Sequence, residues 1–411
     1  MKLKYLFLAM FATAGFISCS NEDDKVDPNA TYDAEVNISV SPSAETATKA
    51  STSGDDESGD AGESNIHRLT AFVFDASGAT VAVKDTSSTV NISYIQDIVV
   101  KAKTQANGGT NYQMFLVANL HGNDALGVAN LNALKGKMTD LSTETNTSLT
   151  MTSKLLNINV VGVEGERLHQ NYVLNASGTS MGNGDTGLTN YNSLTTADYI
   201  PLTRVVSRIQ LDEISISMVG SNYKGSTFRL DSVYLVNVKA KSYFYTDTED
   251  LTVADNFQNG IGVFNIIDGL ISRGATTNTL LVRTPNTTLK SDDASQNKID
   301  FTQSAQANNY LKVYVDENLN PTDYKTMLII CGQITLPNGQ LNPTKSYYHI
   351  VVAGSTTGKY VERNTIYKIT AQITGTGSKN NDENSDLNAA INAKVTVLPW
   401  KVVNQTEDDA N

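Results

Sequence analysis

Residues 34–78 read AEVNISVSPSAETATKASTSGDDESGDAGESNIHRLTAFVFDASG. Val36, Ile38 and Val40 alternate with polar residues, which is the period-2 pattern of a half-buried β-strand. A polar, acidic segment rich in Gly and Ser follows, and it has no large apolar side chains with which to join a core. Leu69–Phe74 then has the apolar, β-branched character of a second strand. The stretch therefore predicts two strands joined by a long exposed loop.

The expected loop between these strands offers targets for a trypsin-like protease. Lys49 lies inside it, and Arg68 lies at its end, against the second strand. Cleavage there would free the first strand, and its loss would expose unpaired backbone groups and apolar pockets that another strand could fill. The alternative interpretation is an ordinary first strand followed by an ordinary surface loop.

The N-terminus has the character of a targeting segment. Lys2 and Lys4 precede the apolar run Tyr5–Ile17, which is shorter than the ~20 residues of a membrane-spanning helix. Cys19 follows this run directly and resembles the lipidated cysteine of a bacterial lipoprotein, although Phe16 stands where such signals usually have Leu. The alternative is a secretory signal with a chance cysteine. Only two cysteines occur in 411 residues, so a disulfide framework is not expected, and lipidation of Cys19 is the favoured interpretation.

Length and composition limit the class of protein. The chain of 411 residues is long enough for two domains, and its 40% hydrophobic content is sufficient for folded cores. A net charge of −12 argues against nucleic acid as a partner. The abundance of Thr, Ser, Asn, Val and Tyr favours a mainly β fold. The second cysteine, Cys331, lies in an apolar run and is expected to be a buried small hydrophobe.

In the first half of the chain, further strands are expected at Ile95–Lys103, at Tyr112–Ala118 and within Ser148–Val163. One helix is expected between Asp124 and Leu141, because Leu131, Leu134, Met138 and Leu141 recur at helical spacing and Asn123 or Asp124 could cap its start. Residues 175–198 are rich in Gly, Asn, Ser and Thr, and they predict a long surface loop.

The second half begins with the strand pattern Thr203–Met218. The apolar phase changes at Asp212-Glu213, which predicts a β-bulge. Short apolar runs separated by turn residues indicate a β-sandwich. Strands are expected at Val233–Val238, Tyr310–Val315, Thr326–Leu336, Tyr347–Ala353, Thr365–Thr374 and, after a polar run, Ala393–Val403.

Signatures of catalysis are missing from the sequence. His67, His121, His169 and His349 are scattered, and none belongs to an HExxH or His/Cys cluster. No GxSxG elbow, Walker loop or SxxK motif occurs. The sequence therefore predicts no catalytic residues, no metal site and no cofactor.

Several segments together resemble the major fimbrial subunits of Bacteroidia, the type V pilins. They are the lipoprotein-like start, the strand AEVNISV, the block TKASTSGDDES, LTAFVFDASG, MFLVANLHG, TRVVSRIQLDEISI, VERNTIYKITAQITGTG and the closing VTVLPWKVVNQ. The resemblance covers most of the mature chain, with long unmatched loops between the segments.

The resemblance implies a subunit that is exported as a lipoprotein to the outer membrane and trimmed by a trypsin-like protease. Such subunits polymerise with identical or related subunits by donor-strand exchange into a cell-surface fimbria for adhesion and biofilm formation. Two β-sandwich-like (transthyretin-like) domains with one or two short helices are expected. The implied organisation is a signal peptide at 1–18, a lipidated propeptide at 19–49, an N-terminal domain at 50–203 and a C-terminal domain at 204–411.

Processing is expected between Lys49 and Ala50, with Lys49 standing where familiar members have Arg; Arg68 is a poorer alternative. The donor strand is expected at about residues 391–404. Its apolar residues are Val395, Val397, Leu398, Trp400 and Val402. Pro399 cannot donate a hydrogen bond, so this strand should be edge-like or should bend there. The alternative is that the strand completes its own domain.

A second class of function is a monomeric surface lipoprotein that binds glycans through exposed aromatic side chains. The aromatic run Tyr243-Phe244-Tyr245 could form such a platform, although a strand with aromatics on both faces explains it equally simply. Trp400 is the only tryptophan, and its place in a strand pattern favours a core or an interface.

Overall fold

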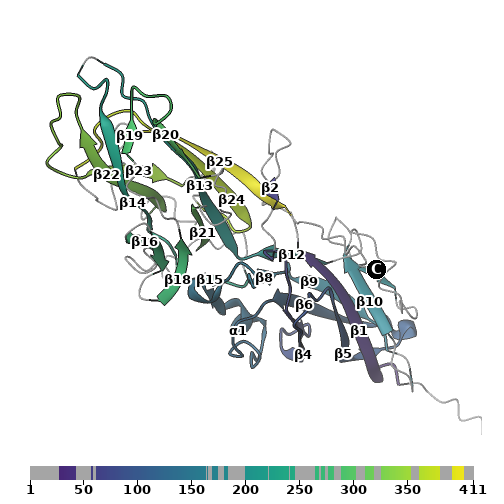
Figure 1. Cartoon of the computed structure of the whole chain (residues 1–411). Coiled ribbons are helices and arrows are strands. Elements are labelled where there is room, and N and C mark those ends of the chain that lie inside the picture. The colour runs from purple at the N-terminus through teal and green to yellow at the C-terminus, as the bar shows by residue number, and fades with distance from the viewer. Residues whose placement is uncertain are drawn as a thin grey trace, which may run out of the picture.

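The fold is mainly β, with two sandwich-like halves that lie end to end in the computed structural model of the chain (Figure 1). The structure describes most of residues 27–42, 62–162, 200–245, 288–301, 311–318, 325–352, 361–379 and 391–401, together with short segments at 57–58, 164, 169–174, 180–183, 264–267, 270–273 and 276–281; residues 221 and 240 are not described.

The N-terminal half is built on a ten-stranded mixed sheet in the order β11-β10-β1-β12-β8-β6-β3-β4, with β5 paired to β1 and β9 paired to β6. Its strands are β1 (Thr31–Pro42), β3 (Arg68–Phe74), β4 (Thr80–Ser87), β5 (Tyr94–Lys103), β6 (Thr110–Ala118), β8 (Met151–Thr152), β9 (Leu156–Val160), β10 (His169–Leu174), β11 (Ser180–Asn183) and β12 (Ile200–Arg204). β11 lies inside the expected loop 175–198, so that interpretation is wrong at residues 180–183.

The helix expected between Asp124 and Leu141 is present but short, and the expected cap at Asn123 or Asp124 is wrong. The helix α1 spans only Leu131–Lys135, and its cap is Asn130, whose side chain accepts a hydrogen bond from the Ala133 N–H. Gly136 ends the helix, and the chain then forms the short strand β7 (Met138–Asp140), which pairs with β15 (Lys241–Tyr243). Two 3₁₀ turns, Gln105–Asn107 and Leu141–Thr143, complete the helical elements among the described residues.

The C-terminal half contains a six-stranded sheet, β2-β25-β24-β13-β20 with β21 on β13, and a seven-stranded sheet, β18-β17-β16-β14-β22-β23 with β19 on β14. The strands are β2 (Glu57–Ser58), β13 (Val206–Ile216), β14 (Thr227–Val236), β16 (Phe264–Ile267), β17 (Leu270–Arg273), β18 (Thr276–Leu281), β19 (Thr288–Lys290), β20 (Lys298–Asp300), β21 (Leu311–Asp316), β22 (Met327–Thr335), β23 (Ser346–Val351), β24 (Thr365–Ile373) and β25 (Ile391–Lys401).

The expected β-bulge in the first strand of this half is confirmed. The register of β13 against β24 shifts between Leu211 and Glu213. Ile209 and Leu211 before the shift, and Ile214 and Ile216 after it, all lie in the same apolar core. The bulge therefore lets two apolar phases of one strand face one core.

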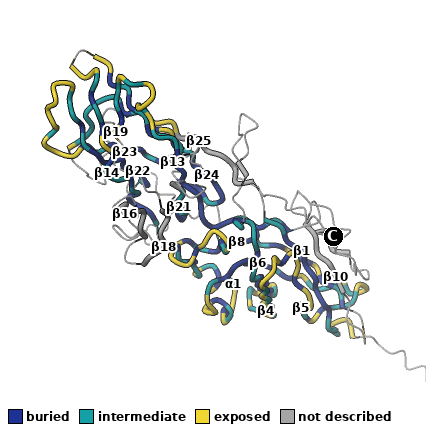
Figure 2. The backbone as a smooth tube through the Cα atoms, in the orientation of Figure 1, coloured by how far each residue is buried: buried dark blue, intermediate teal, exposed yellow. Residues whose placement is uncertain are grey.

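Each half has its own buried apolar core. Exposed segments concentrate in the loops at the far end of the C-terminal half and along α1 and β4 (Figure 2). Cys331 is 3% exposed, as the sequence predicts for a small hydrophobe, and burial raises the pKa of its thiol. Among the residues that the structure describes, no helix has the length and apolar character needed to cross a membrane.

Candidate functional site

The candidate site is the first strand of the fold, β1, which lies in the interior of its sheet (Figure 1). On one edge, β1 pairs antiparallel with β5, for example at Ala34↔Val100. On the other edge it pairs in parallel with β10, at Glu35↔His169, and with β12, at Val40↔Ile200. A strand with hydrogen-bonded neighbours on both edges occupies a slot, and its removal would leave backbone groups unpaired on both sides.

The apolar side chains of β1 belong to the core of the N-terminal half. Val36, Ile38 and Val40 are at most 1% exposed, and they pack in one cluster with residues such as Ile95 and Ile98 of β5. β1 thus contributes to the core as well as to the sheet.

The polar side of β1 is also buried, which differs from the half-buried strand that the sequence predicts. Glu35, Asn37 and Ser39 are 6%, 7% and 1% exposed. Alternation in a sequence reports which face is apolar, but it does not report whether the polar face is covered by other parts of the fold. A hydrogen bond joins the Asn37 Oδ1 to the Asp97 N–H, 3.1 Å apart.

The expected lipidation and processing residues cannot be placed. Cys19, Lys49 and Ala50 lie outside the described residues. Beyond them, β2 is described at Glu57–Ser58, where its backbone pairs in parallel with Trp400 and Lys401 of β25.

From Glu63 onward the chain is tied to both halves of the molecule. The Glu63 carboxylate is fully buried and accepts hydrogen bonds from Arg208 Nη1 at 2.8 and 3.0 Å and from the Tyr314 hydroxyl at 2.5 Å. Arg208 lies in β13 and Tyr314 in β21, so both partners belong to the C-terminal half. Removing one member of a buried ion pair leaves the other charge buried without a partner, which is costly. This contact therefore fixes the segment to the C-terminal half.

Arg204, at the end of β12, strengthens the same junction. Its Nε donates to the Glu63 carbonyl at 3.1 Å, its Nη2 to Ser64 Oγ at 2.9 Å and its Nη1 to Asn364 Oδ1 at 3.1 Å. Burial lowers the pKa of Arg204 to about 10, an effect that the negative charge of Glu63 opposes. The guanidinium is therefore still charged at neutral pH.

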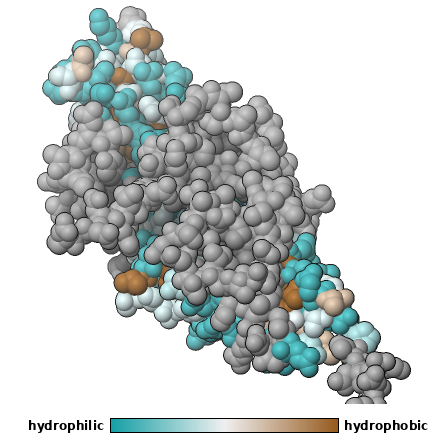
Figure 3. Space-filling model, turned by 90° about the vertical axis from the view of Figure 1, so that its right-hand side faces the viewer, coloured by the Kyte–Doolittle hydropathy of each residue, from teal (hydrophilic) through white to brown (hydrophobic). Residues whose placement is uncertain are grey.

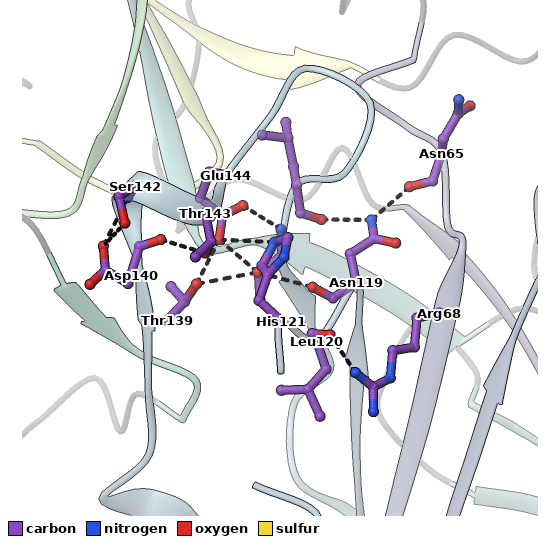
Figure 4. Close-up of polar contacts among 12 residues, drawn as sticks. Asn65, Arg68, Asn119, Leu120, His121, Thr139, Asp140, Ser142, Thr143 and Glu144 are labelled. Atoms are coloured by element: carbon purple, nitrogen blue, oxygen red, sulfur yellow. Dashed lines mark hydrogen bonds and ion pairs between the residues drawn. The ribbon is translucent and has the colours of Figure 1, made fainter. Parts of the chain in front are cut away.

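The next residues, 65–67, are held by Asn119, which lies at the end of β6 in the left-handed conformation at φ 54° (Figure 4). Its Nδ2 donates to the carbonyls of Asn65 and Leu149, and its Oδ1 accepts from the His67 N–H. Asn tolerates this backbone conformation and offers both a donor and an acceptor, so one side chain fixes the segment to the N-terminal half.

Arg68, the alternative processing residue, is locked in place. Its guanidinium donates to the Asp85 carboxylate, to the carbonyls of Leu120 and Gly122 and to Asn123 Oδ1, at 2.6 to 3.2 Å. Its backbone lies in β3, which pairs with β4 and β6. A protease would have to open the sheet to cut there.

The predicted donor strand pairs within its own half. β25 is antiparallel to β24 from Ile391↔Ile373 to Pro399↔Thr365, with Val395 opposite Ile369 and Val397 opposite Tyr367. Leu398 lies opposite Ile366, and Val402 lies outside the described residues. The strand is continuous through Pro399, so it is not divided into two pieces there. Apart from β2 at Trp400 and Lys401, the described residues give β25 no neighbour on its other edge, so it is edge-like as expected.

The central residue of the aromatic run that could have formed a glycan platform packs inward, while Tyr243 and Tyr245 are half-buried. Phe244 is 4% exposed and joins the core cluster with Phe115. The rings of Tyr245 and Phe115 lie against each other, with their centroids 5.9 Å apart. The Lys135 Nζ lies 4.5 Å from the centroid of the Tyr245 ring. The far end of the C-terminal half is mostly hydrophilic in the face that Figure 3 shows. Exposed large hydrophobic residues of this half, such as Val219 and Leu341, are few among the described residues.

Clusters suited to a metal ion are not present among the described residues, where no group of three or more His, Cys, Asp and Glu side chains is suitably placed. The second buried carboxylate near the site, Glu144, accepts hydrogen bonds from Thr139 and from the backbone and side chain of Thr150 (Figure 4). These contacts hold together the loops beneath Asn119 and explain the burial of the charge without a ligand.

The functional residues that the sequence analysis did not assign are Glu63, Arg204, Arg208 and Asn119. Asn119 lies in the segment MFLVANLHG, and both arginines lie in TRVVSRIQLDEISI, two segments that carried the family resemblance. An arginine within an apolar strand pattern is the signal that could have indicated a buried ion pair.

Comparison with known proteins gives matches over most of the chain. Residues 34–204 match the family described as "Major fimbrial subunit protein (FimA)". Over 383 residues the chain is 24% identical to "Putative fimbrium tip subunit Fim1C" of Parabacteroides distasonis, which covers 92% of this chain and 88% of that protein.

Two crystal structures share the fold. A "putative cell adhesion protein" from Parabacteroides distasonis ATCC 8503 matches with a TM-score of 0.60 and 21% identity, covering 90% of this chain and 98% of the other. A fimbrilin (FimA) from Porphyromonas gingivalis W83 matches with a TM-score of 0.53 and 19% identity, covering 90% and 99%.

Proposed function

We propose that this chain is a structural subunit of a cell-surface fimbria, because residues 34–204 match the FimA major fimbrial subunit family. The subunit is exported as a lipoprotein, processed by a trypsin-like protease and polymerised by donor-strand exchange. The observation that carries this proposal is the position of β1, which is the first described strand of the chain and yet lies inside its sheet. Such a strand can be cut away from one end without breaking the rest of the fold.

Processing after Lys49 is supported by what lies on either side of it. Upstream, β1 ends at Pro42; downstream, the contacts of Glu63, Asn65 and His67 hold the chain to both halves. A cut at Lys49 therefore frees β1 while every anchored residue stays in place. A cut at Arg68 would instead sever the anchored segment from β3.

The vacated slot would bind another strand strongly. Val36, Ile38 and Val40 are fully buried, and at about 1.5–3 kcal/mol for each side chain their loss exposes sites worth about 5–9 kcal/mol. The edges of β5 on one side and of β10 and β12 on the other add unpaired N–H and C=O groups.

The strand β25 of a second subunit is the proposed donor. In its own half it has a long ladder with β24 on one edge only. In the slot it would gain neighbours on both edges, and its residues Val395 and Val397 would take the place of apolar residues of β1. Exchange thus replaces a strand with one long ladder by a strand with two, which favours the polymer.

Lipidation of Cys19 would hold the precursor at the outer membrane until processing releases it, since the acyl groups leave with residues 19–49. The partners of the subunit are then identical or related fimbrial subunits and the protease, and we propose no cofactor, metal or catalytic role. Adhesion and biofilm formation follow from the fimbria itself. The glycan-binding alternative has less support, because Phe244 is buried and only Tyr243 and Tyr245 of the aromatic run are partly exposed.

Deletion of the chain from Leu398 onward tests the donor role of β25. The truncated subunit should be exported, processed and folded, but it should remain a monomer on gels of unheated SDS samples, where wild-type fimbriae give a ladder. The double substitution Val395→Asp, Val397→Asp should weaken the ladder in the same way. Circular dichroism of the monomers checks folding, and normal fimbriae from a folded truncated subunit would show that the donor strand lies elsewhere.

A further inference from the structure

The pairing between β1 and β5 contains one irregularity. Val36 is opposite Ile98, but Ile38 is opposite Ile95, so the single residue Asn37 faces two residues of β5. One of the two, Asp97, has a φ of 57°, in the left-handed region that few residues other than Gly, Asn and Asp adopt. This is a β-bulge in the wall of the slot.

The side chain of Asn37 closes this bulge. Its Oδ1 accepts a hydrogen bond from the Asp97 N–H at 3.1 Å, and the side chain is nearly buried, at 7% exposure. The bulge turns this N–H away from the regular ladder, so its acceptor is a side chain of the neighbouring strand. Asp97 itself is exposed and the bond is partly buried, so a strand that replaces β1 without an acceptor at this place would give up one protein hydrogen bond to the Asp97 N–H.

We infer that the bulge at Gln96–Asp97 sets the register of the incoming donor strand, by accepting only a strand with a hydrogen-bond acceptor between two apolar residues. The inference rests on the proposed donor-strand exchange. The occupant is β25 of a second copy of this chain, in the direction of β1, with Thr396 in the place of Asn37. The Thr396 hydroxyl would then accept from the Asp97 N–H.

The sequence of β25 supports this register. With Thr396 at the bulge, Val395 replaces Val36 and Val397 replaces Ile38, while Ala393 takes the place of Ala34. β-Branched residues therefore fill the two pockets beside the bulge, and an alanine meets an alanine site. The Ala34 site belongs to the same antiparallel ladder with β5, because Ala34 pairs with Val100.

A second register is possible in principle, because Asn392 also lies between apolar residues, Ile391 and Ala393. It would place Ala393 in the pocket of Ile38, which leaves a void, and Lys394 in the place of Ser39, which is 1% exposed. The Thr396 register instead brings Leu398 to the Ser39 site and Pro399 to the Val40 site, where the Val40 N–H donates to the Ser93 carbonyl. The Thr396 register also encloses Lys394, at the Glu35 site, which is 6% exposed. What favours the Thr396 register is therefore the filling of the Ile38 pocket by Val397, where the second register would leave a void beside Ala393.

Binding of fluorescent peptides to the processed subunit, with its β25 intact, tests the inference. The peptide is not paired with β24, so the pairing of β25 within its own half does not affect the measurement. A peptide of residues 31–42 should bind, and its Asn37→Val form should bind about tenfold more weakly, the effect of losing one side-chain hydrogen bond to the Asp97 N–H. Its Asn37→Thr form should recover most of the affinity. Equal binding of the Asn37→Val peptide would overturn the role of the bulge.

A peptide of residues 391–405 tests the register. Its Thr396→Val form, which keeps the shape but removes the acceptor, should lose about tenfold in affinity, and Thr396→Asn should restore it. The matched control Asn392→Ala should bind like wild type. Loss on Asn392→Ala with none on Thr396→Val would overturn the assigned register. If the wild-type peptide fails to bind while residues 31–42 bind, β25 is not the donor and the proposed function fails, independently of the Asn37 result.

Discussion

Substitution of Ile38 by Ala should destabilise the unprocessed precursor and leave the stability of the polymer unchanged. Ile38 is 0% exposed in the core of the N-terminal half, opposite Ile95 of β5. Loss of three methyl or methylene groups at such a site costs about 2–5 kcal/mol through lost burial and the cavity left behind. If β1 leaves on processing, the substitution leaves with it, so the mature fimbria should not be affected.

Urea denaturation of the unprocessed precursor measures the first half of this prediction. With a slope of about 2 kcal/mol per molar urea, the unfolding midpoint should fall by about 1–2.5 M. The temperature at which fimbriae dissociate in SDS measures the second half, and it should equal that of wild type. Ile98→Ala is the matched control: Ile98 lies in β5, is 1% exposed and stays in the mature subunit, so it should destabilise both forms.

Two outcomes would refute the reasoning. If Ile38→Ala weakens the fimbria as much as Ile98→Ala does, β1 remains in the polymer. If the precursor keeps its wild-type midpoint, β1 does not contribute to the folded precursor in the way that its burial indicates.

Three further predictions address the anchor, the cut and the junction. Cys19→Ala should abolish labelling by a palmitate analogue and reduce surface fimbriae; continued labelling would contradict the lipidation of Cys19. Lys49→Ala should accumulate a longer species that does not polymerise, whereas Arg68→Gln should be processed normally, as judged by mass spectrometry of the surface protein; the reverse pattern would move the cut to Arg68. Glu63→Gln and Arg208→Met should each lower the free energy of unfolding by about 3–5 kcal/mol, and the double variant by less than the sum; additive losses would contradict a direct pair.

Strands with a strong apolar pattern could be predicted from the sequence. Alternation identified the core residues of β1, and the change of phase at Asp212-Glu213 located the bulge in β13. Both features depend on spacing along the chain, which the sequence records directly.

Elements with weak or ambiguous patterns could not be predicted. The residues of β4 alternate between half-buried and exposed, so this edge strand gives little apolar signal. Met138 and Leu141 fit a helical period, yet the chain leaves the helix at Gly136, and Met138 pairs in β7 with Tyr243, more than a hundred residues away. Tertiary pairing overrides local periodicity at such places.

The candidate site shows the same division. The apolar residues of β1 could be named from the sequence, but the pairing of Glu63 with Arg208 joins residues 145 positions apart. The acceptor role of Asn37 likewise depends on the left-handed backbone of Asp97, sixty residues away. Charges and amides are common in any sequence, so their partners emerge only when the fold brings them together.

The most direct test of donor-strand exchange is the N-terminal sequence of the subunits released by heat from purified fimbriae, combined with their intact mass. The account predicts a start at Ala50 and no residue of Thr31–Pro42 in the fibre. Subunits that still begin at Cys19, or a fibre that retains the peptide of β1, would contradict it.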